Sequence, residues 1–341
     1  MSYTNAINMD EMTADFKIQN TNEFTLDFKL SIKKAQTRIL IKTMNFEPGK
    51  AINSIIEDLI TSSEKGVDVK ISLDAIYDKF YRGDLILLPS LKGASQEGKI
   101  FRHQVTERLR KGGIKVSIHK AFSFFPLLRR NHIKLYVVDN AVWVGGINFT
   151  DQGFRNKDLM IKFTNPAITH RLISLFHKIN TNQIFQNKRF LSNIKILIDE
   201  GRIGKSVIYD TAVDLIKKSQ DRIVLSSPFL PSGKLLRTLM EAGKRGIKIR
   251  IMTSTNSTNI VSFVNNINSL LSFGQIKKNN NTEINYYRAI HTKALVVDGK
   301  QALFGSHNFS FVGVLLGTTE LGIYSDNKLL AQELEKYMTA L

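Results

Sequence analysis

The sequence predicts an α/β protein built from two similar halves in tandem, each a mixed, mostly parallel sheet flanked by helices. An internal repeat is the first reason: ten residues from Ile32 (IKKAQTRILI) are echoed by ten from Ile216 (IKKSQDRIVL). The second reason is that β-branched strands alternate with helical segments in both halves, as in sheets that helices cover on both faces. A chain of 341 residues is also long enough to bury two modest cores.

Each half is expected to contain the same succession of elements. A helix that ends near Ala35 or Ser219 leads into a strand, and a turn with proline and glycine precedes a second helix. This second helix ends at Gly66 or Gly246, and an alternating strand follows it. The two turns with proline and glycine are Pro48–Gly49 and Pro231–Gly233.

The spacing of the repeat predicts two domains of unequal length. The offset between equivalent positions falls from 180 residues after the second helix to 159 at His132 and His291, so the first half carries 21 extra residues. We expect the extra residues to form an insertion at a membrane interface, and a polar stretch to link the halves. The expected segments are a first domain over 1–190, its insertion over about 74–130, a second domain over 191–341, and a linker over 180–193.

The charge balance indicates an anionic partner. The chain has 48 Lys and Arg against 30 Asp and Glu, and the formal net charge of +18 favours nucleic acid or an anionic membrane surface. The absence of cysteine excludes disulfides, thiolate catalysis and cysteine-ligated metal sites. Because Met1–Asp15 lacks the features of a signal peptide and no apolar run is long enough to span a bilayer, we expect neither secretion by that route nor a spanning helix.

Two equivalent segments carry the residues that suggest chemistry. They are HIKLYVVD from His132, followed by GGIN from Gly145, and HTKALVVD from His291, followed by GSHN from Gly305. Residues two apart on a strand share a face, so the histidine and the lysine of each segment project together. A single His-x-Lys would be incidental, but two complete copies at equivalent places in a repeated chain indicate a function.

A hairpin turn after each segment sets its register. A two-residue loop in the first copy pairs Lys134 with Gly145, and a three-residue loop in the second pairs Lys293 with Gly305. A glycine at this position would let a tetrahedral anion approach the backbone, with N–H and side-chain donors just beyond it. We therefore expect two copies of one phosphate cradle. The expected substrate-binding residues are Gly146, Asn148, Ser306 and Asn308.

The two segments resemble the motifs of the phospholipase D superfamily, whose members carry His-x-Lys, four residues and Asp twice and join two halves around one active site. The resemblance covers about Phe24 to Tyr324 and is most specific to the bacterial cardiolipin synthase branch, which RNHIKLYVVD from Arg130 and SPFLP from Ser227 resemble. It implies two tandem phospholipase D-like domains related by pseudo-twofold symmetry, with the site at their interface. Members of that branch often begin with membrane-spanning helices, and His-Arg-Lys is commoner there than His132-Ile-Lys.

The resemblance implies a two-step exchange at a phosphodiester. One histidine attacks phosphorus to form a phosphohistidine, while the other protonates the leaving alcohol and then deprotonates the incoming one. Imidazole suits both tasks because it titrates near neutral pH. Either histidine could be the nucleophile, and the resemblance favours His132. The catalytic motif residues so implied are His132, Lys134, Asp139, His291, Lys293 and Asp298.

Four acidic residues complete the expected site. Asp158 and Glu320 fall where the family places an acid on a later strand, and we expect each to accept the Nδ1–H of a histidine and fix its tautomer. Asp139 and Asp298 belong to the motifs but lie at turns, so a structural role, for example in a salt bridge, is expected for them. No metal or other cofactor is expected, because two lysines already offset the charge of the diester. The other histidines, His307 among them, are expected to be ordinary.

The leading hypothesis is a phosphatidyltransferase of the cardiolipin synthase type that acts on phospholipids at an anionic membrane surface. The phenylalanine-rich run 121–130 before the first motif suits docking to lipid, although a core segment is the alternative. Hydrolysis of phospholipids, and a metal-independent nuclease or phosphodiesterase acting on DNA or RNA, are the alternative activities, since the cradle and the charge also suit a polyanion. An inactive binding relative is a third possibility, which the two complete motifs disfavour. The expected location is cytoplasmic and peripheral to a membrane, and the oligomeric state is left open.

Overall fold

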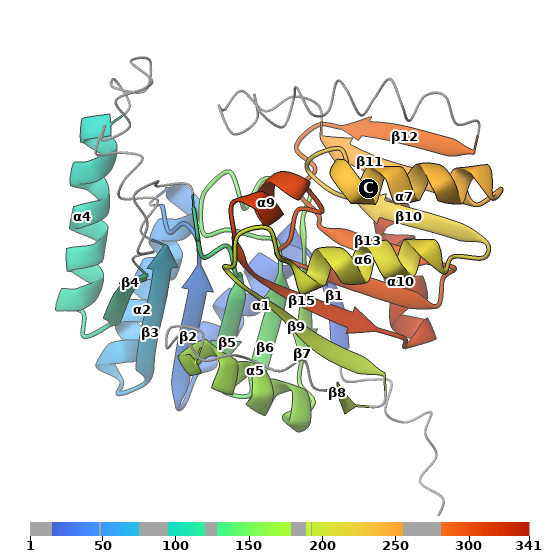
Figure 1. The fold of residues 1–341 in the computed structure, drawn as a ribbon. Helices are drawn as coiled ribbons and strands as arrows, with labels where there is room; N and C mark the ends of the chain where they lie inside the picture. Colours follow the sequence, from blue (N-terminus) through green and yellow to red (C-terminus); the bar gives the residue numbers. More distant parts are fainter. Residues whose placement is uncertain are drawn as a thin grey trace, which may run out of the picture.

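The computed structural model describes residues 16–47, 49–74, 95–119, 128–178, 189–191, 193–254 and 281–340. Its first half forms a seven-stranded sheet with strand order β1-β7-β6-β5-β2-β3-β4 (Figure 1). The strands are β1 (Phe16–Asn20), β2 (Arg38–Thr43), β3 (Asp68–Asp74), β4 (Lys115–His119), β5 (Leu135–Val138), β6 (Ala141–Gly145) and β7 (Leu159–Phe163). The helices of this half are α1 (Thr21–Lys34), α2 (Lys50–Glu64), α4 (Ser95–Lys111) and α5 (Pro166–Lys178).

The second half forms an eight-stranded sheet with order β12-β11-β10-β13-β14-β15-β9-β8. The strands are β8 (Arg189–Leu191), β9 (Ile194–Glu200), β10 (Arg222–Ser226), β11 (Lys248–Ser254), β12 (Thr282–Tyr287), β13 (Ala294–Val297), β14 (Gln301–Gly305) and β15 (Thr319–Ser325). The helices are α6 (Val207–Lys217), α7 (Gly233–Lys244), α9 (Phe311–Leu315) and α10 (Lys328–Thr339). The seven strands of the first sheet recur in the same order in the second, which confirms the predicted repeat, and β8 is added at one edge.

Antiparallel pairs predominate in both sheets, so the expectation of mostly parallel sheets was wrong. Among the described strands, only β2-β3-β4 and β10-β11-β12 run parallel. The remaining neighbours pair antiparallel. The reason lies in the connections: a short turn such as those between β5 and β6 or β13 and β14 can join only antiparallel strands, whereas a parallel pair needs a crossover.

The predicted local boundaries are confirmed where glycine sets them. After α2 and α7 the chain turns at Gly66 and Gly246, which both have a φ of +90°, a left-handed conformation that glycine adopts without strain. Helix α1 begins with a capping box. The Asn20 side chain accepts from the backbone N–H groups of Asn22 and Glu23, and the Glu23 carboxylate accepts from the Asn20 N–H.

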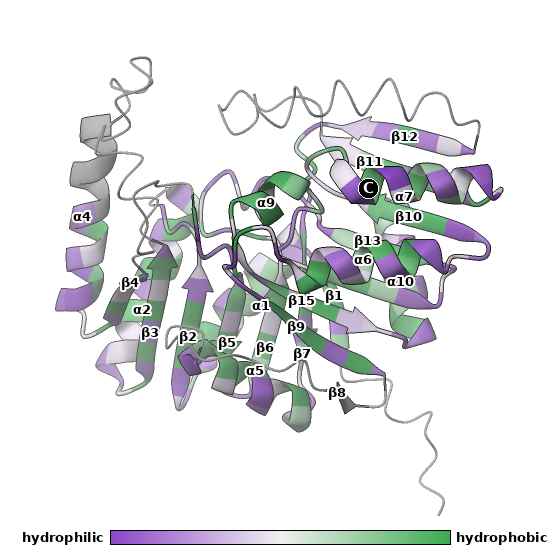
Figure 2. Ribbon diagram, viewed as in Figure 1, coloured by the Kyte–Doolittle hydropathy of each residue, from purple (hydrophilic) through white to green (hydrophobic). Residues whose placement is uncertain are grey.

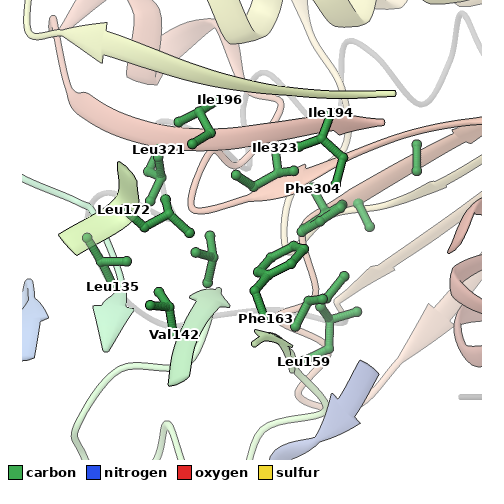
Figure 3. Packing of buried hydrophobic residues seen from close by; sticks show 14 of the residues in the cluster. Leu135, Val142, Leu159, Phe163, Leu172, Ile194, Ile196, Phe304, Leu321 and Ile323 are labelled. Carbon is green, nitrogen blue, oxygen red and sulfur yellow. The ribbon is translucent and has the colours of Figure 1, made fainter. Parts of the chain in front are cut away.

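The two sheets share one core. Helices α1 and α2 cover the outer face of the first sheet and α6 and α7 that of the second, and the central strands β5, β6 and β13 are mainly apolar (Figure 2). The inner faces pack together with α5 and α10 into a single hydrophobic cluster (Figure 3). Labelled members are Leu135, Val142, Leu159, Phe163 and Leu172 from the first half and Ile194, Ile196, Phe304, Leu321 and Ile323 from the second. Because burial of such side chains contributes about 1.5–3 kcal/mol each, this cluster holds the halves in a fixed relation.

The expected domain limits, 1–190 and 191–341, stay a prediction. Strand β8 pairs with β9, so the second sheet already includes Arg189–Leu191, and we propose the boundary just before this strand. Of the insertion over about 74–130, the structure describes α4 and β4, and β4 extends the first sheet beside β3. Residues 75–94 and 120–127 of that insertion, which include most of the phenylalanine-rich run, and most of the linker 180–193 lie outside the described residues.

Candidate active site

The two motif segments lie against each other at the interface of the halves. The His132 N–H donates to the Thr319 carbonyl (2.9 Å), and the Thr319 N–H donates to the Arg130 carbonyl (2.7 Å). The second motif repeats this contact, because the His291 N–H donates to the Lys157 carbonyl (2.9 Å) and Lys157 donates to Ala289. Each histidine is thereby fixed beside the residue that precedes the acid of the other half, as the pseudo-twofold relation requires.

Each histidine bonds to the carboxylate of the opposite half. His132 Nδ1 lies 2.9 and 3.1 Å from the two carboxylate oxygens of Glu320. His291 Nδ1 lies 2.6 Å from Asp158 Oδ2. An ionised carboxylate can only accept, so opposite ionised partners Nδ1 carries the proton in both rings and Nε2 keeps a lone pair. The pairing is therefore crossed between the halves, and neither half contains a complete histidine–acid pair.

A buried lysine accompanies each histidine. Lys134 Nζ donates to the His132 carbonyl at 2.7 Å, and Lys293 Nζ donates to the His291 carbonyl at 2.6 Å. Lys293 Nζ also lies 2.9 and 3.2 Å from the ring nitrogens of His291 and 3.9 Å from Asp158 Oδ2. Both lysine side chains are almost fully buried. Burial lowers the pKa of Lys134 well below 10.5, and the charge of Glu320 opposes that shift.

The electrostatics of the site favour neutral histidines. Burial, and then the neighbouring lysines, lower the pKa of His132 well below 6.5, and Arg130 adds to this effect. The pKa of His291 is also lowered, by burial and by Lys293, but the charge of Asp158 opposes the shift. Burial lowers the pKa of Lys293 to about 8. The two histidines are thus inequivalent in the empty site, with His132 held more firmly in the neutral form.

The predicted hairpin register is confirmed, but the glycine has a different role. The β5–β6 pairing sets Gly145 opposite Lys134, and the Gly305 N–H donates to the Lys293 carbonyl at 3.3 Å. A Cβ at Gly145 would collide with the Leu159 carbonyl oxygen, and one at Gly305 with the equivalent oxygen of β15. The missing side chain therefore admits the neighbouring strand, and not, as expected, an anion.

The four expected substrate-binding residues differ in what they offer. We expected the N–H groups of Gly146 and Ser306 to face the substrate. Both donate instead to carbonyls of the adjacent strands and so have no hydrogen bond left for a substrate. The Ser306 hydroxyl donates to Glu320, whereas a Cβ at Gly146 would lie 2.5 Å from an Asp158 carboxylate oxygen. The carboxamide oxygens of two further residues are buried and lack a hydrogen-bond partner in the described part of the chain, which leaves them capacity for a substrate; these are Asn148 and Asn308.

The two motif aspartates lie at the turns that follow their strands and do not contact the histidines of the described site. Asp139 accepts from the backbone N–H groups of residues 36–38 at 2.8–3.1 Å. Asp298 accepts from those of residues 220–222 at 2.8–3.2 Å. Both have a positive φ, which Asp tolerates better than most residues. Each aspartate joins its hairpin to the helix–strand connection beside it through hydrogen bonds from backbone N–H groups, a structural role that takes this form and not the salt bridge given as an example.

Two residues near the site were not singled out by sequence. Arg130 has a buried Nε without a hydrogen-bond partner among the described residues, and its charge interacts with Glu320. His307 is buried beside Ser306, where its Nδ1 accepts from the Phe309 N–H at 2.9 Å. The signal that could have found Arg130 is the comparison of the two copies, because Ala289 occupies its place in the second.

No group of three or more His, Cys, Asp or Glu with the geometry of a metal site occurs among the residues that the structure describes. Over those same ranges, none of the helices combines the length and the apolar character needed to traverse a bilayer. 

Comparison with solved structures identifies the fold. The crystal structure of phosphatidylserine synthase from Haemophilus influenzae Rd KW20 superposes with a TM-score of 0.75 at 14% identity, over 95% of this chain and 85% of that one. The structure of polyphosphate kinase from Porphyromonas gingivalis matches with a TM-score of 0.61 at 13% identity, over 97% of this chain and 51% of the kinase. Both similarities concern the arrangement of two α/β domains.

Sequence comparison identifies the family. The model of the family "Cardiolipin synthase, PLD-like domain" matches residues 29–180 and 212–341, and this chain belongs to that family. Cardiolipin synthase A of Pectobacterium carotovorum is 22% identical over 313 residues, which cover 81% of this chain and 58% of the relative. Cardiolipin synthase A of Buchnera aphidicola is 22% identical over 353 residues, which cover 94% of this chain and 67% of the relative. The chain thus spans about three-fifths to two-thirds of the length of these relatives.

Proposed function

We propose that this protein is a phosphatidyltransferase of the cardiolipin synthase type, which transfers a phosphatidyl group between phospholipids through a covalent phosphohistidine. The observation that carries the proposal is the crossed arrangement of two histidines, each bonded through Nδ1 to a carboxylate of the other half. Such a bond orients the ring and raises the basicity of Nε2, as an acid–base or nucleophilic histidine needs. The named relatives, two cardiolipin synthases and a phosphatidylserine synthase, support a phospholipid as the substrate.

In the proposed first step, His132 Nε2 attacks phosphorus, a P–N bond forms, and the P–O bond to the leaving alcohol breaks. His291 Nε2 gives its proton to the leaving oxygen. In the second step an acceptor alcohol gives its proton to His291, its oxygen attacks phosphorus, and the P–N bond breaks to free His132. His132 is the better candidate for the nucleophile, because burial and three cations lower its pKa, whereas the charge of Asp158 opposes the lowering of the His291 pKa.

A cation lies beside the ring of His291 and keeps its own proton. Lys293 Nζ lies 3.2 Å from His291 Nε2, and burial lowers the pKa of Lys293 to about 8. The negative charge of an entering diester raises the pKa of both imidazoles, so that His291 can take up a proton as the substrate binds. Lys134 and Lys293 then offset the charge that develops on the non-bridging oxygens. The unpartnered carboxamide oxygens of Asn148 and Asn308 accept hydrogen bonds from hydroxyl groups of the substrate.

A direct assay distinguishes this function from its alternatives. The protein is incubated with phosphatidylglycerol vesicles and, separately, with single- and double-stranded DNA, in each case with EDTA. We expect cardiolipin and glycerol from the vesicles, which His132→Ala and His291→Ala each abolish, while His170→Ala, at an exposed position, leaves turnover unchanged. Release of phosphatidic acid without cardiolipin would indicate hydrolysis. Cleaved DNA beside intact lipid would contradict the proposal.

The pH dependence of kcat/KM tests the assigned protonation states. Because burial and the lysines lower the pKa of His132, the nucleophile stays neutral below pH 6.5, and the acid limb should lie below that value. Above about pH 8 Lys293 loses its proton and kcat/KM should fall. In Lys293→Arg the limb near pH 8 should be absent, since a guanidinium stays protonated. An unchanged alkaline limb in this variant would exclude Lys293 as its cause.

A further inference from the structure

The second half carries two surface features that its pseudo-symmetric counterpart lacks, and both adjoin the site. The connection that follows Asn308 contains α9 and is apolar (SFVGVLLG), whereas the equivalent connection after Asn148 is polar (FTDQGFRNK). In addition, residues 201–206 separate β9 from α6, whereas α1 follows β1 directly in the first half. Because the first half folds without either feature, neither is required by the architecture.

These two features pack against each other through their backbones. The Gly204 N–H donates to the Val314 carbonyl at 2.9 Å. A Cβ at Gly317 would lie 2.8 Å from the Gly201 carbonyl oxygen and 2.9 Å from the Ile203 nitrogen, so glycine is needed for this contact. Gly201 and Gly317 both have a positive φ. The close contact between the backbones forms a defined surface, which we name the α9 patch: residues 201–205 together with 311–317.

The α9 patch exposes apolar side chains and is edged by cations. Ile203 is 51% exposed and Leu315 48% exposed, although most side chains of their size are buried elsewhere in the described chain. Helix α9 is accordingly drawn as apolar in Figure 2. The exposed cations of the α9 patch are Arg202 and Lys205, and exposed Arg129 lies beside it; Glu200 pairs with Arg202 at 3.0 Å. An exposed apolar surface with a net positive rim is complementary to an anionic lipid surface.

The α9 patch is continuous with the reacting groups. The Arg129 N–H donates to the Leu316 carbonyl at 2.9 Å, and three residues further on the Thr319 carbonyl accepts from His132. Glu320, which bonds to His132, follows directly. A bilayer that rests on Ile203 and Leu315 would therefore contact the segment whose Thr319 carbonyl, four residues after Leu315, is bonded to His132. This is where a lipid phosphodiester has to arrive.

We propose that the α9 patch is the surface through which this protein docks on an anionic phospholipid bilayer, with Ile203 and Leu315 entering the apolar boundary and the cations facing the headgroups. The proposal rests on the phospholipid substrate assigned above and identifies the surface that presents it. Residues 201–205 and 311–317 all belong to the described part of the second half, and of its rim only Arg129 belongs to the phenylalanine-rich run 121–130.

The test compares matched pairs of exposed apolar residues. The double variant Ile203→Ser/Leu315→Ser removes the patch, and Leu26→Ser/Leu30→Ser removes two leucines of α1 that are 64% and 48% exposed, on the helix layer outside the first sheet. Binding is measured by co-sedimentation with vesicles of phosphatidylcholine alone or mixed with phosphatidylglycerol. We expect the native protein to prefer the mixed vesicles, the patch variant to bind them about tenfold more weakly or worse, and the α1 variant to bind unchanged. Thermal unfolding controls for the fold of each variant.

Activity separates this proposal from the proposed function. On phosphatidylglycerol with short acyl chains, dispersed as monomers, the patch variant should turn over like the native protein, whereas on vesicles it should be slower. Equal vesicle binding by the patch variant and the native protein would overturn the docking proposal. So would a self-associating native protein that the substitutions make monomeric, because the patch would then be an interface between copies. A native protein that binds vesicles through the patch but transfers no phosphatidyl group would refute the function and leave the docking surface standing.

Discussion

Replacement of Glu320 by Gln is the sharpest test of the crossed pairs. The side chain is almost completely buried, and its carboxylate accepts from His132 Nδ1 at 2.9 and 3.1 Å and from the Ser306 hydroxyl. Glutamine keeps the shape but removes the charge. A hydrogen bond to a charged group contributes about 1.5–3 kcal/mol, which corresponds to a loss of about 10- to 150-fold in kcat/KM at about 1.4 kcal/mol per tenfold.

The same substitution should not weaken the fold. Burial raises the pKa of Glu320, so the folded state disfavours its ionised form. A raised folded-state pKa gives stability that is present below the unfolded pKa of about 4.5 and is lost as pH rises through the folded value. At neutral pH the neutral amide therefore costs little or nothing in the free energy of unfolding. A slower protein that melts no lower than the native one separates catalysis from stability.

The assay follows release of p-nitrophenol from a p-nitrophenyl phosphodiester, both in the first turnover and at steady state. Glu283→Gln is the matched control, because Glu283 is an exposed acid on the edge strand β12 that pairs with Arg250. We expect the control to match the native rate. If Glu320→Gln loses less than about threefold with its fold intact, the charge of Glu320 does not support His132, and the reasoning from the crossed pair is refuted.

Three further predictions use the same chemistry and the same assays. Asp158→Asn should slow cleavage of a diester with an alkyl leaving group by about 10- to 100-fold and cleavage of a p-nitrophenyl diester much less, because only the poorer leaving group needs a proton from His291. Equal losses of rate on both diesters would contradict this role. Asp139→Ala should lower the free energy of unfolding by about 2–3 kcal/mol in chemical denaturation, through its lost bonds to backbone N–H groups, and change kcat/KM by less than about threefold; a rate loss at full stability would assign it to the chemistry. Gly145→Ala should lower the free energy of unfolding by about 1–3 kcal/mol, because its Cβ would meet the carbonyl oxygen of the neighbouring strand. The control Gly313→Ala, whose Cβ would meet nothing nearer than 3.9 Å, should change it by less than about 0.5 kcal/mol. Similar melting temperatures for the two variants would show that β6 and β7 can separate.

Local chemistry explains which predictions from sequence succeed. The ends of α2 and α7 are fixed by glycines, and the hairpin registers by turns of two and three residues, so each depends on only a few neighbouring residues. Lys134 and Lys293 do contact their histidines, but the strand period does not explain it, because β5 and β13 begin only at Leu135 and Ala294.

Contacts between distant segments explain what the sequence could not reveal. Nothing near His132 indicates that its acid is Glu320, 188 residues away, and not Asp158. The mostly antiparallel pairing was missed because alternation of strands and helices was interpreted as a series of parallel crossovers, although two hairpins had been recognised. The role of Gly145 was misassigned because the strand that needs the space lies later in the chain.

The covalent linkage of the halves has a consequence for the direction of cleavage. In a dimer of identical halves each substitution would appear twice, and a diester could enter in either orientation with equal effect. Here the copies have diverged: Gly146 lies against Asp158 where Ser306 lies against Glu320, and Arg130 has no counterpart. The two imidazoles are electrically distinct before any substrate binds. A phosphodiester with two unlike ends should therefore lose the same end in every turnover, a polarity that the chain itself imposes.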